Sequence, residues 1–184
     1  MKNLSVRDMV LVALFAALTA VLAQISIALP FGPIPITGQT LAVMLSGALL
    51  GARLGAYSQV IYLLLGAVGL PVFSKAQAGL NVLVGPTGGF LFSFILGAYV
   101  IGKLLERRQK PSLPYLGLVT AIGGMLVVYL IGVPWLAYVT GMTLPRALAV
   151  GVWPFILGDL LKVIVSSIIV QGMLARNLTG VLQK

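Results

Sequence analysis

Long apolar segments alternate with short stretches of glycine, proline, polar or basic residues along the whole chain. A helix of about 20 apolar residues crosses the ~30 Å hydrocarbon core of a bilayer, so these segments are candidate membrane spans. Two of them are short for this purpose and would have to be tilted or shielded by their neighbours. The pattern predicts an all-α integral membrane protein, a single membrane domain formed by residues 1–184. Its six predicted transmembrane helices cover approximately residues 7–28, 38–52, 55–70, 89–106, 114–140 and 145–175.

The first apolar segment has an alternative explanation as a secretory signal peptide. Ser26 and Ala28 form a small-x-small pair that resembles a cleavage site. The apolar run is longer than an ordinary signal-peptide core, however, and cleavage would remove one of the six predicted helices. We therefore treat it as a membrane span.

The composition excludes several classes of protein. Hydrophobic residues make up 60% of the chain and charged residues only 8%, whereas soluble domains carry about 25% charged residues. The chain has no cysteine and no histidine, so disulfides, thiol or imidazole catalysis and most zinc sites are excluded. We expect no metal, no cofactor and no enzymatic activity.

Lysine and arginine outnumber aspartate and glutamate by 12 to 3. In a soluble protein this excess would suggest a nucleic-acid partner, but here the basic residues lie at the ends of apolar segments. Cytoplasmic loops of membrane proteins are enriched in lysine and arginine. With six spans and both termini cytoplasmic, only Lys75 and Arg146 lie outside, and Lys162 lies within a span. The cytoplasmic set is Lys2, Arg7, Arg53, Lys103, Arg107, Arg108, Lys110, Arg176 and Lys184.

The two stretches with the least helical character, residues 29–38 and 71–89, both fall on the external side in this topology. Irregular backbone near a membrane is tolerated where protein buries it or where it lines a cavity. Plain connecting loops would explain the same lengths. The stretches and the residues that follow them also carry uncharged donors and acceptors, which favours an external cap over a ligand cavity. These polar residues are Thr37, Gln39, Thr40, Gln77, Asn81 and Thr87.

The last apolar segment contains an acid and a base, Asp159 and Lys162. Residues three apart on a helix share a face. If the helix begins near Pro145 and rises 1.5 Å per residue, Asp159 lies about 21 Å along it. Ionisable residues inside a span are costly and usually have a partner. The pair is therefore either a self-neutralising structural ion pair or part of a polar ligand site.

Three sequence blocks, and their order, resemble the BioY family, the biotin-specific substrate-binding subunits of energy-coupling factor (ECF) transporters. The blocks are PITGQTLAVMLSGALLGARLGAYSQVIYLLLGAVGLPVF, GPTGGFLFSFILGAYVIG and GDLLKV, within about residues 30–165. The resemblance implies a six-helix protein in a prokaryotic cell membrane that captures biotin with high affinity. It also implies as partners a transmembrane coupling subunit and two cytoplasmic ATPases.

The resemblance further implies that Asn81, Asp159 and Lys162 contact biotin. Members of the family can also use an arginine after GPTGG, but none occurs here between Gly89 and Lys103, so Lys75 is a candidate to replace it. From the chemistry of biotin we add polar contacts from Gln39 and Thr37, and apolar cover from Phe73 and Tyr62. We favour the ureido ring next to Asp159, because a carboxylate there would be repelled.

The first helix carries two small-xxx-small pairs, a pattern that allows another helix to approach closely. By itself the pattern also fits packing inside the protein. The resemblance implies that this face contacts the coupling subunit. The residues are Ala13, Ala16, Ala17 and Ala20.

Two other functions remain open from the sequence. An autonomous ion-coupled carrier or channel could use Asp159 as its ion site, although the two halves of the chain show no convincing repeat. A small membrane enzyme could use Asp159 and Lys162 as acid and base, and we regard it as the weakest of the three.

Overall fold

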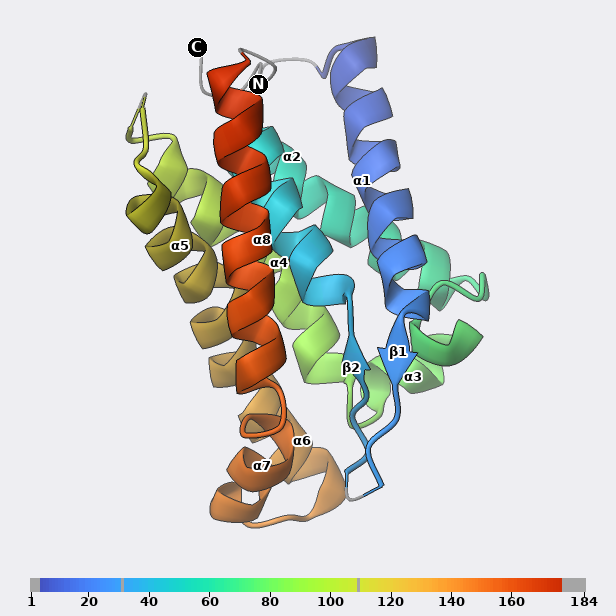
Figure 1. The fold of residues 1–184 in the computed structure, drawn as a ribbon. Coiled ribbons are helices and arrows are strands. Elements are labelled where there is room, and N and C mark those ends of the chain that lie inside the picture. Colours follow the sequence, from blue (N-terminus) through green and yellow to red (C-terminus); the bar gives the residue numbers. More distant parts are fainter. Residues whose placement is uncertain (1–3, 31, 109, 177–184) are drawn as a thin grey trace.

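The computed structural model describes residues 4–30, 32–108 and 110–176, so the predicted cytoplasmic residues Lys2 and Lys184 lie outside it. This part of the chain is mostly helical and contains five helices that are long and apolar enough to cross a membrane (Figure 1). They are α1 (Val6–Gln24), α2 (Gln39–Ala67), α4 (Gly88–Leu105), the continuous stretch Leu113–Thr140 and α8 (Ile156–Ala175). The stretch Leu113–Thr140 consists of α5 (Leu113–Ala121), the π-helical turn η2 (Ile122–Leu126) and α6 (Val127–Thr140).

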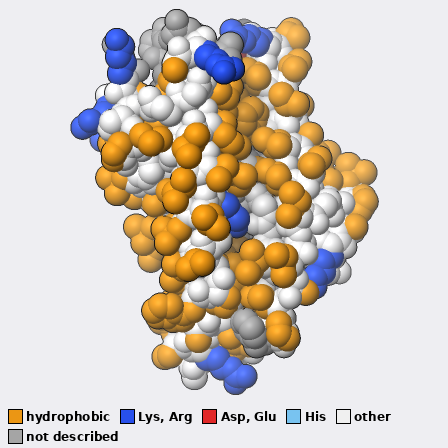
Figure 2. Space-filling model, in the orientation of Figure 1, with side chains coloured by type: hydrophobic (Ala, Val, Ile, Leu, Met, Phe, Trp, Pro, Cys, Tyr) orange, Lys and Arg blue, Asp and Glu red, His pale blue; other side chains and the backbone are white. Residues whose placement is uncertain are grey.

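Large hydrophobic side chains are exposed along α1 and α8, among them Leu14 and Val21 on α1 and Leu161 and Ile168 on α8. Such surfaces are stable in lipid rather than in water, which makes the chain a membrane protein. The start of α1 and the end of α8 lie at the same end of the bundle (Figure 1). Several basic side chains lie at that end, and hydrophobic side chains occupy much of the rest of the visible face (Figure 2).

Helix α2 is broken at Gly51, whose φ of 81° and ψ of 179° belong to a region that is open essentially only to glycine. The two halves then lie side by side. The Gln59 amide donates to the Ser46 hydroxyl at 3.1 Å, and the Gln39 amide donates to the Tyr62 hydroxyl at 2.6 Å. The two short segments predicted at 38–52 and 55–70 correspond to these halves, which is why the described residues hold five candidate spanning helices where we expected six.

The first helix is shorter than predicted and the fold is not entirely helical. Helix α1 ends at Gln24 instead of residue 28, because β1 (Ser26–Ile27) pairs antiparallel with β2 (Ile36–Thr37). The sequence between the two strands contains Pro30, Pro33 and Pro35, and prolines at this density disfavour a helix. This small hairpin places Thr37 two residues before Gln39, the first residue of α2.

The predicted helix 145–175 is two helices. Helix α7 (Leu144–Gly151) ends before Pro154, and α8 begins at Ile156. Proline lacks the amide hydrogen and clashes with the preceding turn, so it interrupts the helix. Asp159 consequently lies in the first turn of α8, and its expected position about 21 Å along a continuous helix was wrong.

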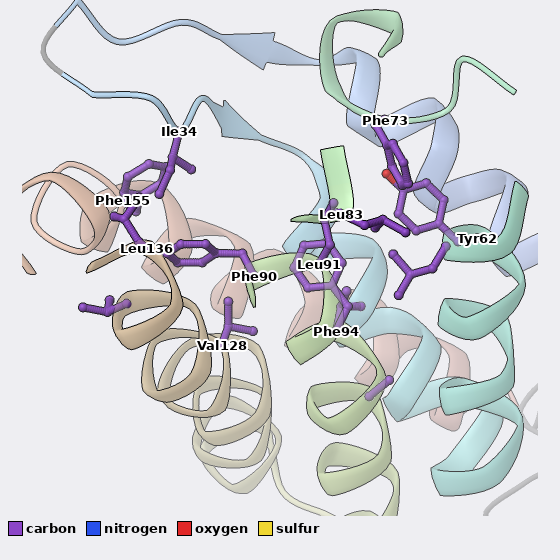
Figure 3. Packing of buried hydrophobic residues seen from close by; sticks show 14 of the residues in the cluster. Ile34, Tyr62, Phe73, Leu83, Phe90, Leu91, Phe94, Val128, Leu136 and Phe155 are labelled. Atoms are coloured by element: carbon purple, nitrogen blue, oxygen red, sulfur yellow. The ribbon is translucent and has the colours of Figure 1, made fainter. Parts of the chain in front are cut away.

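The predicted cap at 71–89 contains the short 3₁₀ helix η1 (Ser74–Ala76) and helix α3 (Leu80–Val84). A cluster of buried aromatic and aliphatic residues joins this cap to the hairpin, to α4 and α6, and to the segment that precedes α8 (Figure 3). The cluster includes Ile34, Phe73, Phe90, Phe94 and Phe155. It holds the irregular segments against the helices and so builds the apolar wall of the site described below.

Substitution of Gly51 tests the break in α2. We expect Gly51→Ala to lower the free energy of unfolding by about 1–3 kcal/mol, because an L-residue is strained in this conformation. The measurement is the unfolding midpoint of the purified protein in detergent. Gly172→Ala is the matched control, since a β-carbon at Gly172 meets no atom within 4 Å. Equal midpoints for the two variants would contradict the assigned backbone at Gly51.

Candidate binding site

A cavity lies where the hairpin, the start of α2, η1, the start of α4, α6 and the start of α8 meet. Its empty space, including the open mouth, is about 840 Å³. Its lining is Pro33, Ile34, Pro35, Thr37, Gln39, Thr40, Phe73, Ser74, Lys75, Gln77, Val82, Thr87, Phe90, Leu91, Phe94, Val128, Tyr129, Gly151, Phe155, Asp159 and Lys162.

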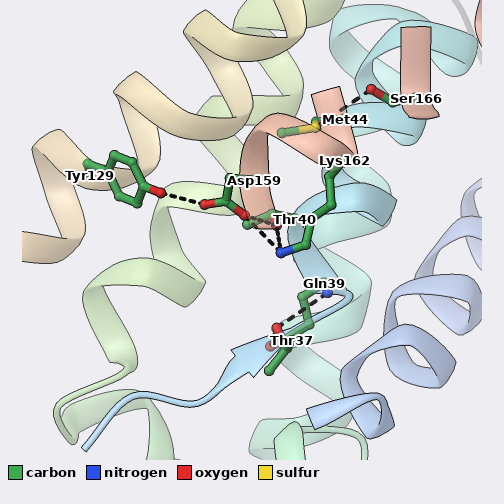
Figure 4. A network of polar contacts seen from close by, with 8 residues as sticks. All are labelled: Thr37, Gln39, Thr40, Met44, Tyr129, Asp159, Lys162 and Ser166. Carbon is green, nitrogen blue, oxygen red and sulfur yellow. Dashed lines mark hydrogen bonds and ion pairs between the residues drawn. The ribbon is translucent and has the colours of Figure 1, made fainter. Parts of the chain in front are cut away.

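Asp159 is 2% exposed, and donors from three elements hold its carboxylate (Figure 4). The Thr40 hydroxyl of α2 donates to Oδ1 at 3.1 Å, and the Lys162 ammonium of α8 donates to the same oxygen at 2.8 Å. The Tyr129 hydroxyl of α6 donates to Oδ2. The first turn of α8 adds the positive end of a helix dipole. These interactions offset the free-energy cost of removing the charged Asp159 carboxylate from water.

Lys162 binds both Asp159 and the Thr40 hydroxyl, the latter at 2.9 Å. An ammonium group has three protons. Among the described residues these two acceptors leave one proton of Lys162 free, and the side chain remains 16% exposed in the cavity wall. The pair therefore presents a free N–H donor beside carboxylate and phenol oxygens that still have lone pairs. Such a surface suits an uncharged group with both donors and acceptors.

A second polar group lies at the start of α2. The Thr37 hydroxyl donates to Gln39 Oε1 at 2.8 Å, and Gln39 Nε2 donates to the Tyr62 hydroxyl at 2.6 Å. Tyr62 in turn donates to the Val72 carbonyl at 3.2 Å. These bonds fix the orientation of the Gln39 amide, which lines the cavity.

Phe73 forms an apolar wall and is 2% exposed. Its ring packs edge-on against Tyr62, with ring centroids 5.6 Å apart. A β-carbon at Gly66 would lie 2.1 Å from the Phe73 ring. Only glycine at position 66 allows the ring to occupy this position.

Comparisons with known proteins agree with this architecture. The family model described as the BioY family matches residues 1–178. The chain belongs to the BioY family. It is 42% identical to the biotin transporter BioY of Rhizobium etli over 178 residues, covering 93% of this chain and 95% of the relative. It is also 42% identical to the biotin transporter BioY of Thermotoga maritima over 163 residues, covering 89% and 93% of the two chains.

A solved structure has the same fold. The crystal structure of the S-component for biotin from an ECF-type ABC transporter superposes on this BioY-family chain with a TM-score of 0.86. The match covers 94% of both chains at 27% identity. The overall fold is therefore shared with that S-component.

Five of the residues that we predicted for the ligand site in this BioY-family chain line the cavity: Thr37, Gln39, Phe73, Asp159 and Lys162. Two others are not in the lining. Tyr62 is 0% exposed and lies behind Gln39, which it positions. Asn81 is exposed on α3, and its direct contact with ligand stays a prediction.

Sequence reasoning missed Tyr129. It lies in an apolar span 30 residues from Asp159, so no local pattern connects the two. Thr40 was noted as a polar residue of the cap region but not as a partner of Asp159. Its position directly after Gln39 was the available signal.

The four alanines of α1 do not form one exposed face. Ala13 and Ala17 are exposed, Ala20 is half-buried, and Ala16 is 0% exposed within the core. In this conformation Ala13 and Ala17 are the members of the predicted partner face that another protein can reach.

Removing one member of the buried ion pair tests its role in stability. We expect Asp159→Leu to lower the free energy of unfolding by about 3–5 kcal/mol, since it leaves the Lys162 charge without its partner. The double variant Asp159→Leu/Lys162→Met should recover most of this loss. Unfolding midpoints of ligand-free protein give the comparison.

Lys103→Met is the control for this experiment. It removes an exposed pair with Glu106 whose atoms lie 3.5 Å apart, and such pairs contribute about 0–1 kcal/mol. An Asp159→Leu variant as stable as Lys103→Met would show that the buried pair is dispensable for the fold.

Proposed function

We propose that this chain is the high-affinity biotin-binding subunit, or S component, of an ECF-type ABC vitamin uptake transporter. The observation that carries the proposal is an aromatic-walled cavity whose base presents the Asp159–Lys162 pair. Membership of the BioY family, relatives described as biotin transporters, and the likeness to an S-component for biotin support it.

The cavity matches the chemistry of biotin. The ureido ring has two N–H donors and one strong carbonyl acceptor. Asp159 and Tyr129 offer acceptor oxygens, and the free proton of Lys162 offers a donor to the carbonyl. Gln39 and Thr37 line the cavity nearby with amide and hydroxyl groups, while Phe73 and Phe90 suit the thiophane ring and the aliphatic chain.

The proposed topology has six crossing segments in the cell membrane of a prokaryote. The two halves of α2 on either side of Gly51 count as separate crossings, and both termini are cytoplasmic. Several basic side chains at the end where α1 begins and α8 ends support this orientation (Figure 2). The cavity, with the cap at 29–38 and 71–89, then opens to the outside.

The proposed partners are a transmembrane coupling subunit and two cytoplasmic ATPases, which supply the energy for transport. The glycine-rich element at 85–89 lacks the following Lys-Ser/Thr of a nucleotide-binding loop, so the energy has to come from other chains. The exposed Ala13 and Ala17 allow a partner helix to approach α1 closely. The chain itself is proposed to carry out no catalysis.

Titration of the purified chain with biotin tests ligand recognition. We expect saturable binding of one biotin per chain, weaker binding of desthiobiotin and no binding of thiamine. Lys162→Met should weaken biotin binding by about ten- to a hundredfold, because a hydrogen bond to a charged group contributes about 1.5–3 kcal/mol. Calorimetry gives the affinities. Absence of biotin binding by the unaltered chain would refute the proposal.

Uptake in cells tests the need for partners. Cells that express the chain without any coupling subunit or ATPase should accumulate radiolabelled biotin no faster than cells without the chain. Adding the coupling module should restore uptake. Full uptake without the module would instead favour the autonomous ion-coupled carrier.

A further inference from the structure

We propose that Lys75, at the mouth of the cavity, binds the carboxylate of the ligand, and that Gln24 positions the segment carrying it. The inference rests on the proposed function, and it assigns the two ends of the ligand to opposite ends of the cavity. The uncharged ring lies at the Asp159–Lys162 pair and the carboxylate lies at Lys75.

The first argument is the distribution of charge. The charged residues that line the cavity are Lys75, Asp159 and Lys162. Asp159 and Lys162 neutralise each other at 2.8 Å. Across residues 4–30, 32–108 and 110–176, neither of the two ion pairs involves Lys75, whose side chain is exposed. The inner end of the cavity, formed by the Asp159–Lys162 pair, therefore has no net charge, whereas the opening carries the unpaired positive charge of Lys75.

The end of the cavity formed by Asp159 and Lys162 is unsuited to binding a carboxylate. Asp159 already accepts three hydrogen bonds, and a second carboxylate beside it would meet a like charge at short range. Lys162 cannot offset this repulsion alone, because two of its protons already bind Asp159 and Thr40. A carboxylate at the mouth avoids Asp159 and gains the charge of Lys75.

The second argument is the backbone of the cap. Lys75 has φ 58° and ψ 35°, and the next residue, Ala76, has φ 55°. Left-handed conformations cost L-residues roughly 1–2 kcal/mol each, so two in succession are unusual. Strained residues of this kind concentrate at functional sites and persist where their surroundings hold them.

The segment is held by the end of α1 and the start of β1. Gln24 Nε2 donates to the Phe73 carbonyl at 3.2 Å, and the Ala76 amide donates to Gln24 Oε1 at 3.1 Å. The Ser26 and Ser74 hydroxyls lie 3.3 Å apart. Gln24 thus binds the backbone on both sides of Lys75 and keeps its α-carbon at the cavity mouth.

The test compares biotin with biotin amide, which keeps the rings but has a neutral tail. The unaltered chain should bind biotin about three- to thirtyfold more tightly than the amide, the range expected for one partly exposed charged hydrogen bond. Lys75→Met should reduce biotin affinity to that of the amide and leave amide binding unchanged. Gln24→Leu should partially lower the ratio of biotin affinity to biotin-amide affinity.

Two controls separate a ligand contact from a structural effect. Arg146→Met removes the other predicted external basic residue, which is exposed on α7 and absent from the cavity lining, so it should affect neither ligand. Lys162→Met should weaken both ligands by the same factor.

The outcomes are distinct. Equal weakening of both ligands by Lys75→Met, or no discrimination by the unaltered chain, would overturn the inference. Loss of discrimination only in Lys162→Met would place the carboxylate at the base of the cavity and reverse the orientation. Failure of the unaltered chain to bind either ligand would refute the proposed function instead.

Discussion

A carboxylate buried inside a membrane protein has to be neutralised and hydrogen-bonded, and Asp159 meets this requirement with groups from three helices. Thr40 comes from α2, Tyr129 from α6 and Lys162 from α8. Each of these helices must therefore lie in one place for the charge to be tolerated. The same contacts form the base of the cavity, so the requirement that stabilises the fold also orients the polar groups available to a ligand.

Interruptions of helices place these groups. The hairpin of β1 and β2 ends where α2 begins, which puts Thr37, Gln39 and Thr40 at the cavity. The break before α8 puts Asp159 in the first turn of that helix rather than deep in a continuous span. Irregular backbone in a membrane protein is tolerated where protein buries it or where it lines a cavity, and residues at these interruptions line the cavity.

The aromatic cluster gives the site its apolar wall and depends on close contacts between distant segments. Phe73 of the cap fits only because residue 66 is glycine, and Phe90 and Phe155 approach from α4 and from the break before α8. A ligand ring in this cavity would meet preformed apolar surface. The polar edge of the ligand would meet polar side chains of the cavity whose orientations are already set by hydrogen bonds.

The sequence by itself determined that the chain is a membrane protein, because apolar runs and sparse charge act locally and can be counted. It also predicted Asp159, Lys162, Gln39, Thr37 and Phe73 for a ligand site, and all five line the cavity, since polar or charged groups among apolar neighbours are conspicuous and the family resemblance selects among them. Only the tertiary structure decided that Tyr129 and Thr40 hold the carboxylate, that Tyr62 supports Gln39 from behind, and that Ala16 is buried. Those facts depend on how helices far apart in sequence pack and where they break, and residue spacing along one helix carries no information about either.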